Sequence, residues 1–268
     1  MAYRLVIVGA GKMGSALAGG LLDAGWCAPG ELALVEHDAV TRAAETERFA
    51  PVAVLAALEI EHVDESSGAV LCVKPDHAES VARLVGAMGA GRLLSIVAGM
   101  STARLEAATP PATAVVRAMP NTPVLVGRGV SAIAGGARAT SDDLTWAESV
   151  LGAVGTVVRV SERSLDAVTG LSGAMPAYVF LVVEALIEAG VLQGLTRDVA
   201  RDLVVGTLAG SAELLERTGE APEVLRANVT SPAGVTAAGL RVLEGRALRA
   251  AILDAVAAAT ERSRQLGR

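Results

Sequence analysis

Three glycines with a fixed spacing stand near the start of the chain. The stretch VIVGAGKMGSALAGGLL places Gly9, Gly11 and Gly14 directly after an apolar run and ahead of a helix-like segment. In such a loop the first glycine permits a tight turn, the second lets a pyrophosphate approach the backbone, and the third lets helix and strand pack closely. Glu36 ends the next apolar run, about 20 residues after the third glycine, where a carboxylate accepts a hydrogen bond from a ribose 2′-hydroxyl. The pattern predicts a dinucleotide site, with a glycine-rich structural turn as the alternative, and its expected cofactor-binding residues here are Gly9, Gly11, Lys12, Met13, Gly14, Glu36 and His37.

Glu36 also bears on which nicotinamide cofactor is used. A carboxylate at this position repels a 2′-phosphate and therefore favours NADH. Arg42 lies within reach as a phosphate partner, and a protonated His37 could contribute, so NADPH and NADH both remain candidate cofactors. A solvated charge on a helix is the more common role for a residue such as Arg42.

A second stretch, NVTSPAGVTAAGLRVLE at residues 228–244, is crowded with Thr, Ser, Pro and Gly at its start. Ser231 precedes Pro232, which is the order of an N-cap and a first helical residue, so free amides of a starting helix are expected there. Free amides at a helix start bind anions. The stretch predicts a carboxylate site made of backbone amides and hydroxyls, and an ordinary turn between helices is the alternative.

Side chains that could act as an acid or a base are scarce. The chain contains two lysines, Lys12 and Lys74, and no histidine follows His77. Reduction of a ketone usually needs such a group for the proton on oxygen, and positioned acid catalysis contributes about 10²–10⁴-fold. An imine asks for less, because its nitrogen is basic enough to be protonated before hydride arrives. The scarcity favours an imine substrate, with the Thr236 hydroxyl hydrogen-bonding its nitrogen; a helix cap is the other role open to that threonine.

The elements that must hold these residues follow from the alternation of apolar runs and helix-like segments up to about residue 160. Strands are expected at 4–8, 32–36, 69–73, 93–97, 114–118, 130–134 and 156–160, and helices at 12–24, 39–48, 76–88 and 141–152. This alternation is typical of βαβ units. Beyond it the segments 161–170, 176–191, 197–217 and 233–265 look helical. We therefore expect an α/β Rossmann-type domain at 1–160 followed by an all-α domain at 161–268.

Composition narrows the function classes. The chain has 52% hydrophobic and 2% aromatic residues and a net charge of −6, so nucleic acid, which needs a basic face and stacking platforms, is disfavoured as a partner. Cys27 and Cys72 lack metal or redox spacing and the three histidines are scattered, so no metal site and a cytoplasmic location are expected. The N-terminus lacks a signal-peptide pattern, and the apolar run AMPAYVFLVV is shorter than a membrane span. Helices apolar around much of their circumference need burial on more than one face, which favours association into a homo-oligomer through the second domain, a helical core within one chain being the alternative.

Three further segments, taken with the glycine loop, resemble the pyrroline-5-carboxylate reductase family. They are LCVKP at 71–75, RAMPNTP at 117–123 and the stretch at 228–244, and the likeness runs in order over nearly the whole chain. The resemblance implies a helical dimerisation domain and reduction of the cyclic imine 1-pyrroline-5-carboxylate to L-proline with NADPH or NADH. It implies that Val73, Lys74, Pro75 and Asn121 bind the cofactor, and that Ser231, Gly234, Val235 and Thr236 bind the substrate.

The sequence departs from the family pattern at three places. SGAMPAY at 172–178 replaces the usual SGSGPAY, so Ala174 lacks a hydroxyl and Met175 adds a flexible side chain before Pro176, where a helix is expected to start. Leu58 or Glu59 stands where the family often has an asparagine at the adenine ribose. Ala233 replaces a glycine, which limits backbone freedom but is expected to suit a helix start.

These departures leave two other functions open. A reductase of a six-membered cyclic imino acid is the nearest alternative, motivated by the change at residues 174 and 175. A nucleotide-binding regulatory protein without catalysis is the alternative from another class. The retained MPNTP and TSPAGVT motifs disfavour it, because a sensor of cofactor alone needs no carboxylate loop.

Overall fold

The computed structural model describes residues 2–267 and divides into two compact units. The sheet unit comprises Met1–Ala174 and Ala258–Arg268, and the helical unit comprises Met175–Ala257. The expected domain boundary after residue 160 coincides with the end of the sheet, whereas the compact units divide at residues 174 and 175. Whether residues 1–160 and 161–268 are the folding domains stays a prediction.

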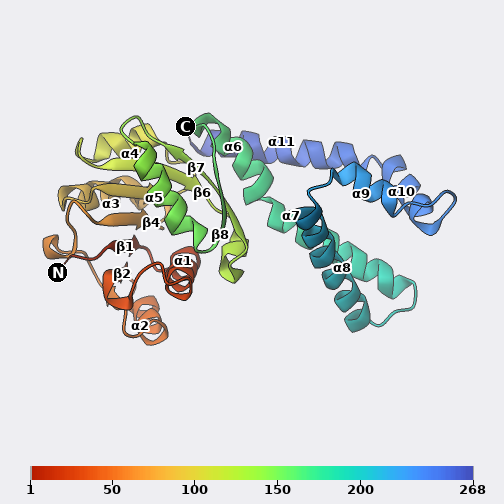
Figure 1. The fold of residues 1–268 in the computed structure, drawn as a ribbon, viewed down its shortest axis with the longest axis horizontal. Coiled ribbons are helices and arrows are strands. Elements are labelled where there is room, and N and C mark those ends of the chain that lie inside the picture. Colours follow the sequence, from red (N-terminus) through yellow and green to blue (C-terminus); the bar gives the residue numbers. More distant parts are fainter. Residues whose placement is uncertain (1, 268) are drawn as a thin grey trace. The chain divides into compact units, whose positions relative to one another are not determined.

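The sheet unit is built on eight strands in the order β3-β2-β1-β4-β5-β6-β7-β8 (Figure 1). All neighbouring pairs are parallel except β6 and β7, which are antiparallel. The strands are β1 (Leu5–Val8), β2 (Leu32–Val35), β3 (Ala53–Leu55), β4 (Gly68–Leu71), β5 (Arg92–Ser95), β6 (Ala114–Met119), β7 (Gly129–Gly135) and β8 (Gly155–Arg159). In an open parallel sheet with this order, ligands bind outside the carboxyl ends of the strands.

Alternate residues of the central strands pack into two separate apolar cores. In β1, Leu5 and Ile7 lie in one core, and Val6 and Val8 lie in the other. Helices α1 (Lys12–Asp23) and α5 (Ser141–Gly152) cover the first core, while α3 (Pro75–Ala87) and α4 (Thr102–Ala108) cover the second. Burial on both faces explains why these strands read as continuous apolar runs.

The remaining helical elements of the sheet unit lie at its edge and beyond β8. Helix α2 (Ala39–Arg48) follows β2, and the segment after β8 forms a short 3₁₀ turn η4 (Glu162–Ser164), then α6 (Leu165–Val168), then a π-helical turn η5 (Thr169–Gly173). The last residues of α11 (Leu248–Leu266) also belong to this unit, where the Ser263 hydroxyl donates to the Asp166 carboxylate at 2.7 Å. The α/β Rossmann-type fold with a following helical part is confirmed.

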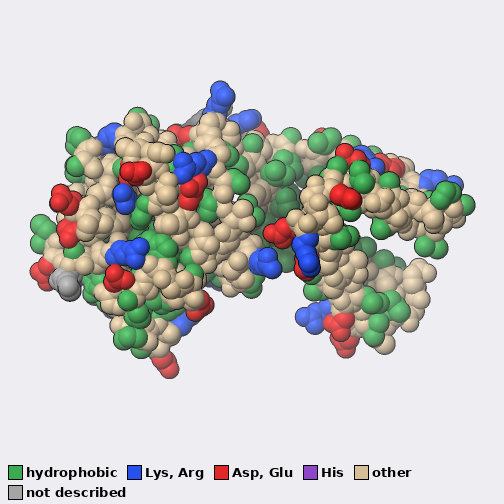
Figure 2. Space-filling model, in the orientation of Figure 1, with side chains coloured by type: hydrophobic (Ala, Val, Ile, Leu, Met, Phe, Trp, Pro, Cys, Tyr) green, Lys and Arg blue, Asp and Glu red, His purple; other side chains and the backbone are tan. Residues whose placement is uncertain are grey.

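The helical unit contains α7 (Met175–Leu192), α8 (Arg197–Thr218), α9 (Pro222–Asn228), α10 (Val235–Gly245) and the first part of α11. Helices α7 and α8 pack closely, because a Cβ built on Gly190 would lie 2.9 Å from the Ala200 Cβ. Much of the apolar surface of these helices remains exposed, including Phe180 at 62%, Leu181 at 66% and Leu253 at 71%. Figure 2 shows such hydrophobic side chains on the surface of this unit.

The structure corrects several details of the sequence reading. Strand β3 and the short helices α4 and α9 were not expected, and the single helix expected over 233–265 is broken between α10 and α11, where Ala247 has a φ of 56°. The expected N-cap at Ser231 and first helical residue at Pro232 were wrong. Helix α10 begins at Val235 with Gly234 as its N-cap.

The ten-residue run AMPAYVFLVV is shorter than a membrane span, as expected, but it lies within a helix that is long and apolar enough to cross a membrane by length and composition alone. The turn η4, helix α6, turn η5 and helix α7 form one continuous helical run, Glu162–Leu192. Its most apolar 18-residue segment has a mean hydropathy of 1.8 and is not buried within the single chain. The same properties belong to a helix that packs against a second copy of a chain.

Candidate active site

The glycine loop joins β1 to α1 and has the geometry that its spacing predicts. Gly9 has a φ of 100°, and a Cβ there would lie 2.5 Å from the Cys72 carbonyl oxygen. A Cβ on Gly14 would lie 2.0 Å from the Gly9 carbonyl oxygen, so the helix can approach the loop this closely only because residue 14 is glycine. Gly11 is the N-cap of α1 and has open space around its Cβ position, with Lys12 and Met13 starting the helix. Free amides thus face open space at the positive end of α1.

Glu36 lies directly after β2 and is folded back onto the glycine loop. Its carboxylate accepts a hydrogen bond from the Ala10 amide at 3.1 Å and from the Asp38 amide at 3.0 Å. The side chain is only 10% exposed, while the neighbouring His37 ring is 92% exposed with its Nδ1 3.2 Å from a Glu36 oxygen. Arg42 donates to the main-chain carbonyls of Glu36 and His37 at 2.9 and 3.0 Å. Its guanidinium therefore braces this turn, which differs from the free surface charge expected.

Val73, Lys74 and Pro75 form the turn from β4 into α3. Lys74 is the N-cap and Pro75 the first residue of the helix. The turn touches the glycine loop, since a Cβ on Gly9 would lie 3.2 Å from the Val73 amide nitrogen. The carboxyl ends of β1, β2 and β4 thus bring the loop, Glu36 and this turn together.

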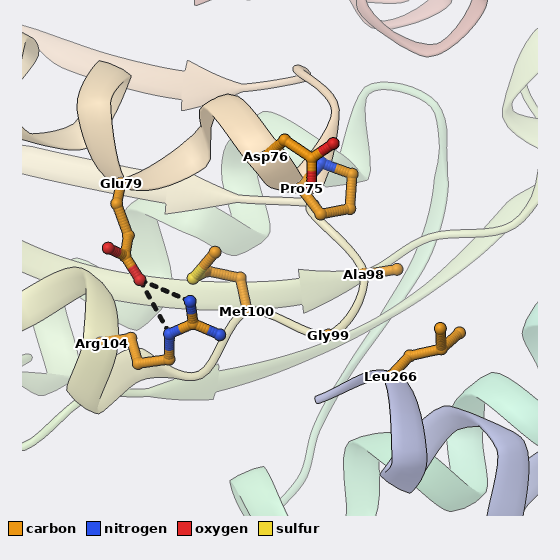
Figure 3. Close-up of a pocket in the computed structure, with 8 residues that line it drawn as sticks. All are labelled: Pro75, Asp76, Glu79, Ala98, Gly99, Met100, Arg104 and Leu266. Carbon is orange, nitrogen blue, oxygen red and sulfur yellow. Dashed lines mark hydrogen bonds and ion pairs between the residues drawn. The ribbon is translucent and has the colours of Figure 1, made fainter. Parts of the chain in front are cut away.

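Beside the turn lies an open cavity of about 430 Å³ within the sheet unit. Figure 3 shows Glu79 of α3 and Arg104 of α4 paired directly at its wall, with Met100 beside the pair. The Arg104 Nε donates to a Glu79 carboxylate oxygen at 2.8 Å. Leu266 also lines the cavity, and a Cβ on Gly99 would lie 2.9 Å from its carbonyl oxygen, so the end of α11 rests on the loop after β5.

Asn121 follows β6 and is the N-cap of the 3₁₀ helix η3 (Thr122–Val126), which packs against α1. Its side-chain oxygen accepts from the Val130 amide at 2.8 Å, and its nitrogen donates to the Ser172 hydroxyl at 3.2 Å and the Ser172 carbonyl at 3.4 Å. This contact of Ser172 was not expected from the sequence. The only signal for it was the serine that begins SGAMPAY at 172–178.

An ion pair between the buried Arg117 and the half-buried Glu162 lies at the same edge of the sheet. The Glu162 carboxylate accepts from the Thr102 amide at 2.6 Å, from the Thr102 hydroxyl at 2.7 Å and from Arg117 at 3.4 Å. Arg117 is 6% exposed, and its Nε has no hydrogen-bond partner among the described residues. This pair ties the start of α4 and the strand before Asn121 to the turn η4. An arginine inside the apolar strand VVRAM was the signal in the sequence.

The thiol of Cys72, a residue whose carbonyl packs against Gly9, is not activated as a nucleophile. Burial raises the pKa of Cys72 to about 12, so its thiol stays protonated at neutral pH. Among the described residues no group of three or more His, Cys, Asp and Glu side chains could hold a metal ion.

The expected substrate residues lie in the helical unit, at the start of α10. Ala233 has a φ of 57°, so its replacement of a glycine is strained rather than suited to a helix start. A Cβ on Gly234 would lie 2.4 Å from the Ser231 hydroxyl oxygen, so a larger residue there would displace that side chain. Val235 is 92% exposed and Thr236 is half-buried in the first turn. Ser231, Gly234, Val235 and Thr236 are thus neighbours around a helix N-terminus with free amides.

The residues present fit a dinucleotide cofactor. A Cβ at Gly9 or Gly14 would clash with the backbone that shapes the loop, and the open space at Gly11 leaves the backbone accessible to a pyrophosphate. Leu58, expected at the adenine ribose, is 6% exposed and belongs to the second core, whereas Glu59 is exposed. Of these two, only the Glu59 side chain is available to a ligand.

Comparisons with known proteins agree over the whole chain. Residues 162–266 match the profile described as pyrroline-5-carboxylate reductase dimerisation, and residues 4–99 match that of NADP oxidoreductase, coenzyme F420-dependent. A pyrroline-5-carboxylate reductase of Synechocystis is 40% identical, covering 100% of both chains.

Solved structures give the same result. A pyrroline-5-carboxylate reductase of Coxiella burnetii is 30% identical with a TM-score of 0.91, covering 100% of both chains. A Plasmodium falciparum pyrroline carboxylate reductase with NADP bound is 31% identical with a TM-score of 0.84, covering 99% of this chain and 98% of that one. Sequence and fold, over their full length, place the chain in the pyrroline-5-carboxylate reductase family.

Proposed function

We propose that this protein is an NAD(P)H-dependent oxidoreductase that reduces 1-pyrroline-5-carboxylate to L-proline, the last step of proline biosynthesis. The observation that carries the proposal is the convergence of the glycine loop, Glu36 and the Val73–Pro75 turn at one edge of the sheet. When bound, the reduced nicotinamide supplies a hydride to the imine carbon, and the nitrogen keeps the proton it already carries.

The residues at that edge are assigned to two parts of the cofactor, the pyrophosphate and the nicotinamide. Gly9, Gly11 and Gly14 leave room for the pyrophosphate against the amides of Lys12 and Met13. Lys12 is the first residue of α1, and its ammonium would add a cation near the phosphates. Val73, Lys74, Pro75 and Asn121 stand further along the sheet edge, where the nicotinamide half of the cofactor would lie.

Substrate recognition is assigned to the start of α10. Its free amides, with the Ser231 hydroxyl, are suited to the substrate carboxylate, which explains recognition without a cation. Gly234 and Val235 would supply backbone amides, and the Thr236 hydroxyl is proposed to hydrogen-bond the imine nitrogen and to relay to it the proton that it carries when the hydride arrives. Thr236 is the proposed catalytic residue in this sense, and no further acid is required for a protonated imine.

NADH is the proposed preference between the two cofactors. The Glu36 carboxylate stays at the edge of the glycine loop, held by two amides, where it would repel a 2′-phosphate. Arg42, the cation nearest to it in sequence, already donates to two carbonyls. The related Plasmodium protein was solved with NADP bound. A higher kcat/KM with NADPH than with NADH would contradict the proposed preference.

The exposed apolar helices of the helical unit are proposed to form a homodimer interface. The apolar surface of the helical run Glu162–Leu192, exposed in the single chain, would then be covered by a second copy of the chain. In this proposal the run does not enter a bilayer, and the enzyme is cytoplasmic. A small-molecule substrate and a second copy of the chain are the proposed partners, with no nucleic acid.

Substrate identity is tested by comparing kcat/KM for five-membered and six-membered cyclic imino acids, with product identification by mass spectrometry. The proposal predicts proline as product and at least about a 10-fold preference for the smaller ring, roughly the discrimination that one methylene gives. A preference for the larger ring would assign the protein to the six-membered homologue and point to Ala174 and Met175. Tight NADH binding without turnover of either imine would support a regulatory protein.

A further inference from the structure

The Asn121 carboxamide is held in one orientation by its surroundings. The Val130 amide can only donate, so the Asn121 oxygen must face it at 2.8 Å. The Asn121 nitrogen consequently faces Ser172, whose hydroxyl and carbonyl oxygens lie 3.2 and 3.4 Å away. Ser172 is therefore the acceptor that completes the clamp on this amide.

Ser172 stands in an unusual piece of backbone. It belongs to the π-helical turn Thr169–Gly173, which is closed by the bond from the Ala174 amide to the Thr169 carbonyl at 3.0 Å. Single π-helical turns are frequent at functional sites. The hydroxyl of Thr169 is already used within the helix, since it donates to the Leu165 carbonyl at 2.8 Å. Between residues 170 and 177 Ser172 carries the only hydroxyl, because Ala174 has none.

Asn121 lies at the edge where the cofactor site is assigned. It follows β6 at the carboxyl end of the parallel strands and caps η3, which packs against α1, the helix of the glycine loop. Whatever orients its carboxamide therefore orients a donor and an acceptor at that edge.

We propose that Ser172 is a positioning residue for the reduction, acting through Asn121. Its hydroxyl accepts from the Asn121 nitrogen and so keeps the carboxamide in the orientation that aligns the bound cofactor with the imine. This inference rests on the proposed function, because it assigns the aligned group as the nicotinamide.

The test is a double-mutant cycle of Ser172→Ala and Asn121→Ala on the full chain. Ser172→Ala is expected to lower kcat about 10-fold, as loss of alignment does, while KM for the imino acid changes less than about two-fold. The double variant is expected to be no slower than Asn121→Ala, because Ser172 acts only through that side chain. Ser172→Thr, which keeps the hydroxyl, is expected to restore most of kcat.

Two controls separate positioning from folding. Ser164→Ala removes a hydroxyl whose partner is the Ser161 hydroxyl at 2.8 Å, upstream of the π-helical turn, and is expected to leave kcat unchanged. Melting temperatures of all variants identify any loss that is only structural. A Ser172→Ala variant with wild-type kcat, effects that add in the double variant, or a loss matched by unfolding would each overturn the proposal.

A second readout keeps the two proposals distinguishable. The dissociation constant of NADH is measured from NADH fluorescence, in the absence of any imine, for the wild type, the two single variants and the double variant. Non-additive weakening there supports the role of Ser172 even when the wild-type chain fails to reduce 1-pyrroline-5-carboxylate, in which case only the proposed function falls. Additive or absent weakening overturns the role of Ser172 directly.

Discussion

Among single residues, Glu36 is the one expected to decide between NADH and NADPH, and a backbone amide of the glycine loop holds its carboxylate in place. The carboxylate accepts an amide hydrogen bond from within the glycine loop while remaining close to where a ribose would lie. The sequence predicted the carboxylate from its distance to Gly14. It could not predict that Arg42 would be engaged by carbonyls, because that depends on the turn that α2 makes after β2.

Removing the charge of Glu36 is expected to shift cofactor preference. Glu36→Gln keeps an oxygen acceptor for the Ala10 amide but no longer repels a 2′-phosphate. We expect the ratio of kcat/KM for NADPH to that for NADH to rise about 10-fold, which corresponds to about 1.4 kcal/mol. The exposed Glu47→Gln on α2 serves as the matched control and is expected to leave the ratio unchanged. An unchanged ratio in Glu36→Gln would remove Glu36 from cofactor selection.

At the scale of the element, the capping of α5 makes stability depend on pH. Burial raises the pKa of Asp143, but hydrogen bonds from Thr140 and the ion pair with Arg92 outweigh it, so the pKa lies below its usual value. The carboxylate accepts from the Thr140 amide at 2.8 Å and from the Arg92 Nε at 2.9 Å. A carboxyl with a lowered folded pKa adds stability above its unfolded pKa of about 3.9 and loses it as pH falls through the folded value.

Asp143→Asn is therefore expected to lower the free energy of unfolding at pH 7 by about 1–3 kcal/mol, the usual cost of hydrogen bonds to a charged group. The difference from wild type is expected to shrink as the pH falls below about 4, where the wild-type carboxyl is also protonated. Denaturant unfolding at several pH values measures both. The exposed neighbour Asp142→Asn is the control, and a deficit that does not change with pH would contradict the assignment.

The start of α10 carries a second prediction at this scale. Ala233 and Ala247 both have positive φ, 57° and 56°, which costs an alanine more than a glycine. Replacing either by glycine is expected to stabilise the protein by about 0.5–1 kcal/mol. Only Ala233→Gly, beside the proposed substrate residues, is expected to change KM for the imino acid, so Ala247→Gly is the matched control. Equal KM effects in both variants would argue against substrate binding at this loop.

The sequence predicted the strands of the sheet and the glycine loop because both depend on local pattern. It misplaced the start of α10, because Ser231 and Pro232 have the order of a cap but Ala233 leaves the helical region of backbone conformation. It did not predict β3, which is three residues long and lies at the sheet edge. The contact between Asn121 and Ser172 joins residues 51 positions apart, and such pairing depends on the finished fold.

At the scale of the whole molecule, the exposed apolar helices predict a homodimer. A charge placed in an interface without a partner is strongly destabilising. Phe180→Glu, at a side chain 62% exposed in the single chain, is expected to convert a dimer into monomers at micromolar concentration in light scattering. Val40→Glu, at a residue 79% exposed on α2, is the control and is expected to leave the dimer intact. A monomeric wild-type protein, or a Phe180→Glu dimer as stable as wild type, would contradict this interface.

The proposed reduction is tested first by the oxidation of NADH and of NADPH by the purified protein, with and without 1-pyrroline-5-carboxylate. We expect oxidation only when the imine is present, one proline formed for each cofactor oxidised, and a higher kcat/KM with NADH. Cofactor that binds but is not oxidised in the presence of the imine would show that the protein is not this reductase.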